Sequence, residues 1–342
     1  MAENLVTAPA GPPSADAKSR GPGNTVQHLL HAHPSLGPLV VLIVAAIIFD
    51  LINGRFFSAA NLSIMLQEAA VIGLLALGQS IIILTAGIDL SVGAAMILAQ
   101  MVMAGLAINS GWPVALAILL GLLVGLLTGL IDGVLVTRFH VPPFIGTLGT
   151  LGVFTALGLL YANGQTLTPG PNSLLVWTGT VIHIGSFSLT TGVLIMLALY
   201  LVVGFILART AWGKHVYAVG DEPEASRLVG INTTRLLLSV YLLAGLVYAI
   251  AAWVQIGRVG DASTDISSTL NLDSITAAVI GGISLFGGRG VVLGTLFGAL
   301  IVQVFQNGLA LAGVQDLYQQ LAEGLLVILA VAVDQWIRRV RK

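Results

Sequence analysis

The stretch TAGIDLSVG, at residues 85–93, combines a carboxylate, hydroxyl groups and glycines between two apolar runs. Asp89 is the only charged residue between Glu68 and Asp132, and Ser91 and two glycines accompany it between two long apolar runs. A carboxylate in such surroundings can bind a substrate, carry a proton, or cap the N–H groups at the start of a helix. The sequence leaves these three roles open.

Further acidic residues lie inside or near apolar runs and raise the hypothesis of a proton-coupled carrier. The candidates are Glu68, Asp89, Asp132, Asp273, Glu323 and Asp334. Apart from Arg235 at the first position of one run, no lysine or arginine lies within the apolar runs to pair with these acids. Most of the acids lie near the ends of the runs, where water is close. A stand-alone proton-coupled carrier of small solutes therefore stays as an alternative function.

Motifs for catalysis are missing from the sequence. The only Gly-Lys pair, Gly213-Lys214, is followed by His215 and does not complete a phosphate-binding loop. There is no H-E-x-x-H motif and no cysteine, so no metal-ligand pattern is found. We therefore expect no catalytic residue, no metal and no cofactor in this chain.

The composition predicts an all-α polytopic membrane protein. Of the 342 residues, 56% are hydrophobic and 8% are charged, and the mean hydropathy is +0.98, whereas soluble domains carry about 25% charged residues. Apolar runs close to the length of a membrane helix predict about ten spans. They lie at 38–53, 62–84, 91–108, 112–136, 143–161, 190–208, 235–256, 271–283, 291–310 and 318–337.

The charge distribution predicts that both termini are cytoplasmic. An even number of spans puts the termini on one side, and that arrangement places twelve of the 14 Lys and Arg residues inside. Only Arg55 and Arg258 fall outside, as the positive-inside rule favours. Residues 1–35 are rich in Pro, Gly, Ala and Ser and predict a disordered cytoplasmic tail ahead of a membrane domain at 36–342.

Two segments predict broken or re-entrant helices, near 85–93 and 271–290. The run 271–283 is too short to cross a bilayer core of roughly 30 Å, and GISLFGG at 282–288 repeats the Gly, Ile, Leu and final Gly of GIDLSVG at 87–93. Paired interrupted segments are typical of transport paths, although two Gly-rich turns explain the pattern equally well. The glycines assigned to the breaks are Gly87, Gly93, Gly281, Gly282, Gly287 and Gly288.

The loops carry two further predictions. The charge-free outer loop at 162–189 contains the partly alternating run TVIHIGSFSL, which predicts a hairpin. The cytoplasmic loop at 209–235 predicts a short helix over 221–230, with Asp221 as its N-cap, Glu224 completing a capping box, and Gly230 ending it. So short a helix is marginal alone and needs a partner surface.

Four long motifs in the chain resemble the permease subunits of bacterial ABC importers for monosaccharides, of the ribose, xylose and galactose type. They are LTAGIDLSVGA (84–94), PPFIGTLGTLGVFTALGLLYANGQT (142–166), RTAWGKHVYAVGDEPEASRLVGI (209–231) and AVIGGISLFGGRGVVLGTLFGALIV (278–302), joined by DQWIRR at 334–339. The likeness covers roughly residues 38–340, and AAWVQIGR together with DQWIRR looks most like fructose-type members.

The resemblance implies an assembly in the bacterial inner membrane. Two permeases would form a homodimeric channel, cytoplasmic ABC ATPase subunits would power it, and a periplasmic sugar-binding protein would deliver the monosaccharide; no nucleic acid is expected. The loop helix then becomes the element that couples to the ATPase, through Asp221, Glu222, Pro223, Glu224, Ala225, Arg227, Leu228 and Gly230. An amino-acid permease of the same broad superfamily is a weaker alternative.

For the translocation path we select polar residues at or near the broken spans. They are Asp89, Ser91, Thr147, Thr150, Asn271 and Asp273. Helix capping and hydrogen bonds between helices are equally good explanations for each of them.

Overall fold

The computed structural model describes residues 36–171, 173–264, 269–315 and 317–322, with residues 324, 325, 328 and 332 beyond them. The predicted tail at 1–35, most of the run at 318–337, Glu323 and Asp334 lie outside the described residues. Apolar helices dominate the described part, and the only strands there form one two-stranded sheet, which confirms the all-α membrane class.

The helices follow the predicted apolar runs closely, because each run is apolar on every face and must bury itself in protein or lipid. They are α2 (Leu36–Asn53), α3 (Ala59–Leu84), α4 (Val92–Ile108), α5 (Val114–Thr137), α6 (Pro143–Ala162), α7 (Thr191–Arg209), α8 (Ala211–Asp221), α9 (Pro223–Leu228), α10 (Thr233–Val259), α11 (Leu270–Ile280) and α12 (Val292–Leu311). Six helices of the described chain, α3, α5, α6, α7, α10 and α12, are long and apolar enough to cross a membrane, and α2, α4 and α11 are shorter apolar helices.

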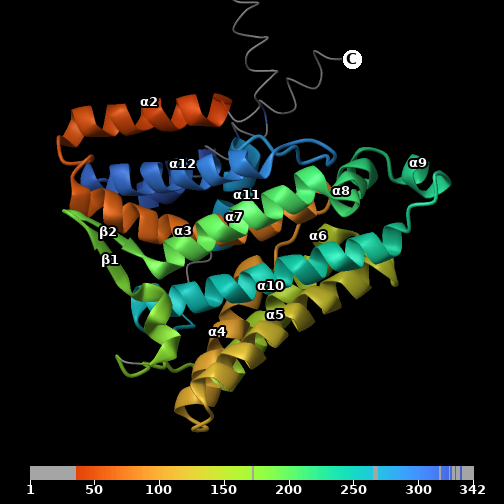
Figure 1. The fold of residues 1–342 in the computed structure, drawn as a ribbon, viewed down its shortest axis with the longest axis horizontal. Helices are drawn as coiled ribbons and strands as arrows, with labels where there is room; N and C mark the ends of the chain where they lie inside the picture. Colours follow the sequence, from red (N-terminus) through yellow and green to blue (C-terminus); the bar gives the residue numbers. More distant parts are fainter. Residues whose placement is uncertain are drawn as a thin grey trace, which may run out of the picture. The chain divides into compact units, whose positions relative to one another are not determined.

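Helix α3 forms the centre of the bundle, and every residue from Ala69 to Leu84 is buried. Helices α10, α11 and α12 pack around it, and α10 also lies along α5 (Figure 1). At that last contact a Cβ on Gly125 would come within 2.4 Å of the Gly245 carbonyl oxygen, so a glycine is required for the two backbones to approach. Outer helices keep large apolar side chains exposed, such as Leu201 and Phe205 of α7, as lipid contact requires.

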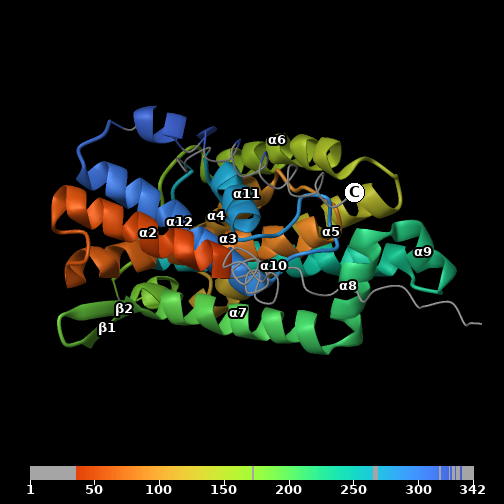
Figure 2. The ribbon, with the colours of Figure 1, turned by 90° about the horizontal axis from the view of Figure 1, so that it is seen from above.

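The predicted hairpin is confirmed in the loop between α6 and α7. A short 3₁₀ helix, η1 (Leu174–Gly179), precedes β1 (Val181–Ile184), which pairs antiparallel with β2 (Phe187–Thr190). The Ser188 amide donates to the Ser63 hydroxyl at 2.9 Å, which ties the hairpin to the start of α3. Both views place the hairpin and α9 at opposite ends of the described bundle (Figures 1 and 2).

Both predicted breaks are present. Helix α3 ends at Leu84 and α4 begins at Val92, with Ala86 between them at a φ of 61°. Helix α11 has 11 residues, about 16 Å at 1.5 Å per residue, and an irregular segment at 281–291 follows it. Of the selected glycines, Gly87 and the four at 281–288 lie at these breaks, while Gly93 falls in the first turn of α4.

Candidate functional site

A polar cavity of about 680 Å³ lies within the bundle, between the first half of α3 and parts of α4, α10, α11 and α12. Its size falls within the roughly 300–1,000 Å³ range of small-molecule sites. The chain contributes three carboxyl groups, one guanidinium and several amides to the described walls. They come from Glu68, Asp261, Asp273, Arg258, Gln100, Gln255, Gln303, Gln306 and Asn307.

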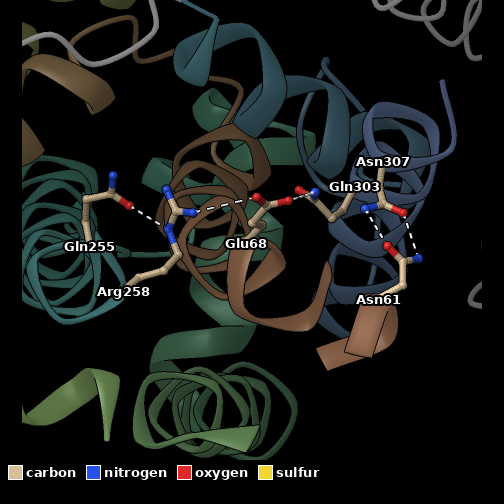
Figure 3. A network of polar contacts seen from close by, with 6 residues as sticks. All are labelled: Asn61, Glu68, Gln255, Arg258, Gln303 and Asn307. Carbon is tan, nitrogen blue, oxygen red and sulfur yellow. Dashed lines mark hydrogen bonds and ion pairs between the residues drawn. The ribbon is translucent and has the colours of Figure 1, made fainter. Parts of the chain in front are cut away.

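A chain of polar contacts connects three helices across this cavity (Figure 3). Glu68 of α3 is the centre: one carboxylate oxygen lies 3.8 Å from the Arg258 guanidinium of α10, and the other accepts a hydrogen bond from the Gln303 amide of α12. The Arg258 Nε donates to the Gln255 amide oxygen at 3.2 Å. Helices α3, α10 and α12 are thus held together by groups that a polar solute can also bind.

Two further contacts hold polar side chains at the rim of this network. Asn61 and Asn307 exchange amide hydrogen bonds of 2.9 and 3.0 Å between α3 and α12. Gln306 donates to the Asp273 carboxylate at 3.3 Å, which places the predicted path residue Asp273 in the cavity wall. Sequence reasoning missed the glutamines because isolated amides within apolar helices carry no motif.

A second polar cluster lies outside the cavity, where the linker between α3 and α4 meets α5 and α6. It contains four of the predicted path residues, Asp89, Ser91, Thr147 and Thr150, together with Asp132. The Ser91 hydroxyl lies 2.7 Å from an Asp89 oxygen and 2.9 Å from an Asp132 oxygen. Within the described ranges, no cationic side chain bonds to either carboxyl group.

The Ser91 hydroxyl has two carboxyl groups as neighbours but a single proton to donate. The single Ser91 proton cannot serve two carboxylate acceptors, so one of these two contacts requires a carboxyl proton. The Thr150 hydroxyl lies 2.6 Å from the other Asp132 oxygen, so Asp132 bridges the linker to α6. All of these contacts are satisfied at once when the two acids hold one proton between them, which we call the shared proton.

The linker backbone is held by side chains from two helices. The Leu90 amide donates to the Thr147 hydroxyl at 3.0 Å. With its amide oriented to satisfy both ends, Gln79 donates to the Asp89 carbonyl at 3.1 Å and accepts from the Asp89 amide at 3.2 Å. These contacts give the irregular backbone the partners that lipid cannot supply.

The start of α4 is capped by a residue from a distant part of the chain. Sequence reasoning assigned this role to Asp89 or Ser91. The Asp89 carboxylate does accept from the Ser91 amide at 2.7 Å, but the Gly93 amide in the first turn donates to the Asn271 side chain of α11 at 2.7 Å. The predicted path residue Asn271 thus connects the two broken segments.

The same two segments also meet at the end of α8, a contact that we call the joint and define as Leu84, Gly220 and Gly288. The Gly288 amide donates to the Leu84 carbonyl at 2.9 Å. Gly220 lies so close that a Cβ there would come within 1.8 Å of the same carbonyl oxygen and 2.6 Å of the Gly288 nitrogen. The loop that contains GISLFGG therefore contacts the end of α3, just before GIDLSVG.

Side chains of α8 strengthen the joint. The Tyr217 hydroxyl donates to the Gly290 carbonyl at 3.0 Å, and burial raises the pKa of this phenol, so it keeps its proton at neutral pH. Asp221 lies 4.0 Å from the Arg289 guanidinium. Helix α8 thus contacts the break after α11 through backbone, hydroxyl and charge.

The predicted capping box of the loop helix is wrong. Asp221 ends α8 instead of starting the next helix, and Glu222, at the N-cap of α9, makes no capping hydrogen bond through its side chain. The Asp221 carboxylate instead lies 4.0 Å from the Arg289 guanidinium, so an ion pair with a distant residue takes the place of the local capping bond. Pro223 in the first turn and Gly230, at a φ of 88° just beyond the C-cap, do bound the helix as predicted.

Helix α9 and its C-cap carry large apolar side chains that are exposed. Leu228 and Val229 are 88% and 78% exposed, although both are large and apolar. Glu224 and Arg227 form an exposed pair at 3.7 Å. Exposed apolar side chains on a charged helix in a loop are typical of a contact surface for another protein.

Comparison with known proteins identifies relatives along nearly the whole chain. The family described as "Branched-chain amino acid transport system / permease component" matches residues 61–331. The chain is 47% identical to the fructose import permease protein of Rhizobium meliloti over 96% of this chain and 92% of that protein. It is 38% identical to the ribose import permease protein of Bacillus subtilis (88% and 92%) and 32% identical to a galactose/methyl galactoside import permease protein of Haemophilus influenzae (86% and 92%). No solved structure matches the chain.

Proposed function

Because the chain belongs to the family of branched-chain amino acid transport system / permease components, we propose that it is the membrane-spanning permease subunit of an ATP-driven importer for a monosaccharide. The observation that carries the proposal is the 47% identity to a fructose import permease protein over 96% of this chain. The polar cavity inside an apolar bundle supports it, because a hydroxylated solute needs polar groups along its route. D-Fructose is the first substrate to test.

The importer needs partners, which we infer from the family to which the chain belongs. Its sequence has no phosphate-binding loop, so ATP hydrolysis is assigned to separate ABC ATPase subunits on the cytoplasmic side. A sugar-binding protein would deliver the solute at the opposite face, and a second copy of this chain would complete the channel. The chain would lie in the bacterial inner membrane with both termini in the cytoplasm, as its basic residues favour.

Helix α3 offers a mechanical route from the ATPase to the cavity. Glu68 contributes to the cavity from the first half of α3, and Leu84, the last residue of this helix, belongs to the joint 16 residues or about 24 Å away. In our proposal, closure of the ATPase subunits moves α9 and α8, and the joint passes this movement to α3 and to the break after α11. The cavity walls then shift relative to one another, which alternates access to the two sides.

The proposal is tested with the full-length chain coexpressed with candidate ABC ATPase and sugar-binding proteins from the same organism. We expect ATPase subunits to copurify with the chain, and reconstituted vesicles to take up D-fructose only with ATP and the binding protein. Uptake that needs no ATP and collapses with a protonophore would instead support the stand-alone carrier. The protonophore experiment is needed because a proton held between Asp89 and Asp132 could also serve a proton-coupled carrier.

A double substitution of Glu224 and Arg227 by alanine tests the coupling role of α9. The pair is exposed, with side chains 80% and 60% accessible, so its loss costs about 1 kcal/mol of stability or less. We expect the protein to be inserted at the normal level, while sugar-stimulated ATP hydrolysis falls several-fold because the docking surface is altered. Western blotting of membranes and ATPase assays of the purified complex measure the two effects. Unchanged uptake and unchanged stimulated hydrolysis would contradict the assignment.

A further inference from the structure

Resting on the proposed function, we propose that Glu68, Arg258, Gln303 and Gln100 form a subsite in the permease for adjacent hydroxyl groups of a neutral polyol of monosaccharide size. We call these four residues the polyol subsite. All four line the cavity and belong to four helices, α3, α10, α12 and α4. The subsite gives the permease its own recognition of the solute, in addition to that of any binding protein.

The first argument is the spacing of the two charged groups. The Arg258 guanidinium and the Glu68 carboxylate are 3.8 Å apart, which is beyond hydrogen-bond distance. Their side chains are 29% and 37% accessible, so a solute in the cavity can reach both. One group only donates hydrogen bonds and the other only accepts them, which matches two neighbouring hydroxyls that respectively accept and donate.

The second argument is the state of the two glutamines. Gln303 and Gln100 are almost entirely buried, and in each the amide oxygen has no hydrogen-bond partner among the described residues. The orientation of each amide is fixed, because its nitrogen donates to an acceptor that cannot donate in return: the Glu68 carboxylate for Gln303 and the Ser263 carbonyl for Gln100. Buried acceptors are normally satisfied, and a solute hydroxyl would satisfy these two once a small shift of each amide exposes its oxygen to the cavity.

The third argument is the charge of the cavity. In the part of the chain that the structure describes, the three acids Glu68, Asp261 and Asp273 face the single base Arg258, so the formal charge of the walls is negative. The charge of Arg258 is already balanced by the neighbouring Glu68 carboxylate, which leaves no described cationic group dedicated to a carboxylate or phosphate. The walls therefore favour a neutral polyol over an amino acid, a sugar acid or a sugar phosphate.

Binding is measured by saturation-transfer NMR, which detects millimolar affinities, on the full-length permease in lipid nanodiscs with D-fructose as the probe. We expect Glu68→Gln and Gln303→Met each to weaken binding about tenfold, because each removes hydrogen-bond partners of a hydroxyl. Gln67→Met is the matched control: Gln67 precedes Glu68 in the same helix but does not line the cavity, so binding should not change. Wild-type affinity in both subsite variants, or no fructose signal from the wild type, would overturn the proposal.

A second measurement uses only the wild-type protein and does not depend on variants that fold. Fructose 6-phosphate and L-leucine should bind at least about tenfold more weakly than fructose, and at least one monodeoxyfructose should also bind more weakly. Equal binding of the whole series would overturn the subsite. The importer proposal and the subsite proposal can fail separately. If the chain binds fructose in this way but never associates with an ATPase, the importer proposal is refuted and the subsite stands. If ATP-driven uptake occurs without any binding of fructose by the permease, only the subsite is refuted.

Discussion

Gly220→Ala is expected to reduce ATP-driven sugar uptake strongly while the protein is still inserted in the membrane. The new methyl group would come within 1.8 Å of the Leu84 carbonyl oxygen and 2.6 Å of the Gly288 nitrogen, the two atoms that form the hydrogen bond of the joint. Backbone on both sides cannot rotate away as a side chain can, so α8 must separate from the two breaks. Overpacking typically costs about 1–3 kcal/mol, and here it acts at the contact through which movement would pass.

The measurement is initial uptake of labelled D-fructose at matched membrane levels of the protein. We expect uptake to fall at least about tenfold, with ATP hydrolysis no longer stimulated by the sugar. Gly204→Ala is the control, since that glycine lies in α7 and a Cβ added to it would meet nothing within 4 Å, so the variant should transport normally. Normal uptake by Gly220→Ala would show that α8 does not transmit movement through this contact.

Asp132→Leu is expected to destabilise the protein strongly, whereas Asp132→Asn should be tolerated. The amide introduced by Asp132→Asn can donate to the Ser91 hydroxyl through its nitrogen and accept from Thr150 through its oxygen, so it replaces the shared carboxyl proton. Leucine removes both hydrogen bonds to residue 132, so Ser91 keeps only its contact with Asp89 and Thr150 only its contact with the Thr147 carbonyl. Each lost hydrogen bond costs about 0.5–3 kcal/mol, with the upper values for charged partners.

Thermal unfolding of the purified full-length chain in detergent measures this difference. For Asp132→Leu we expect the midpoint to fall by on the order of 5 °C or more, while the asparagine variant stays close to the wild type. Uptake should follow the same order. If asparagine were as harmful as leucine, the site would require a negative charge at residue 132, and the shared proton would be refuted.

Much of the architecture is determined by the sequence, because it depends on local composition. Apolar runs alone predict where the helices begin and end, since a run that is apolar on every face has no stable place in water. The hairpin at 181–190 follows from its β-rich run, and the breaks at 85–91 and 281–291 follow from short runs interrupted by glycine. The family can likewise be identified from the sequence, because the motifs that indicate it are long and continuous.

Tertiary structure decides what the polar residues do, because their partners lie far away along the chain. Asn271 caps the first turn of α4 by accepting a hydrogen bond from the Gly93 amide, which lies 178 residues earlier in the chain. Asp221, predicted to cap a helix, instead pairs with Arg289. Glu68, Arg258 and Gln303 come from three separate helices and have no common motif in the sequence. A hydrogen bond needs two groups within about 3 Å of each other, and only the packing of the helices brings these groups together.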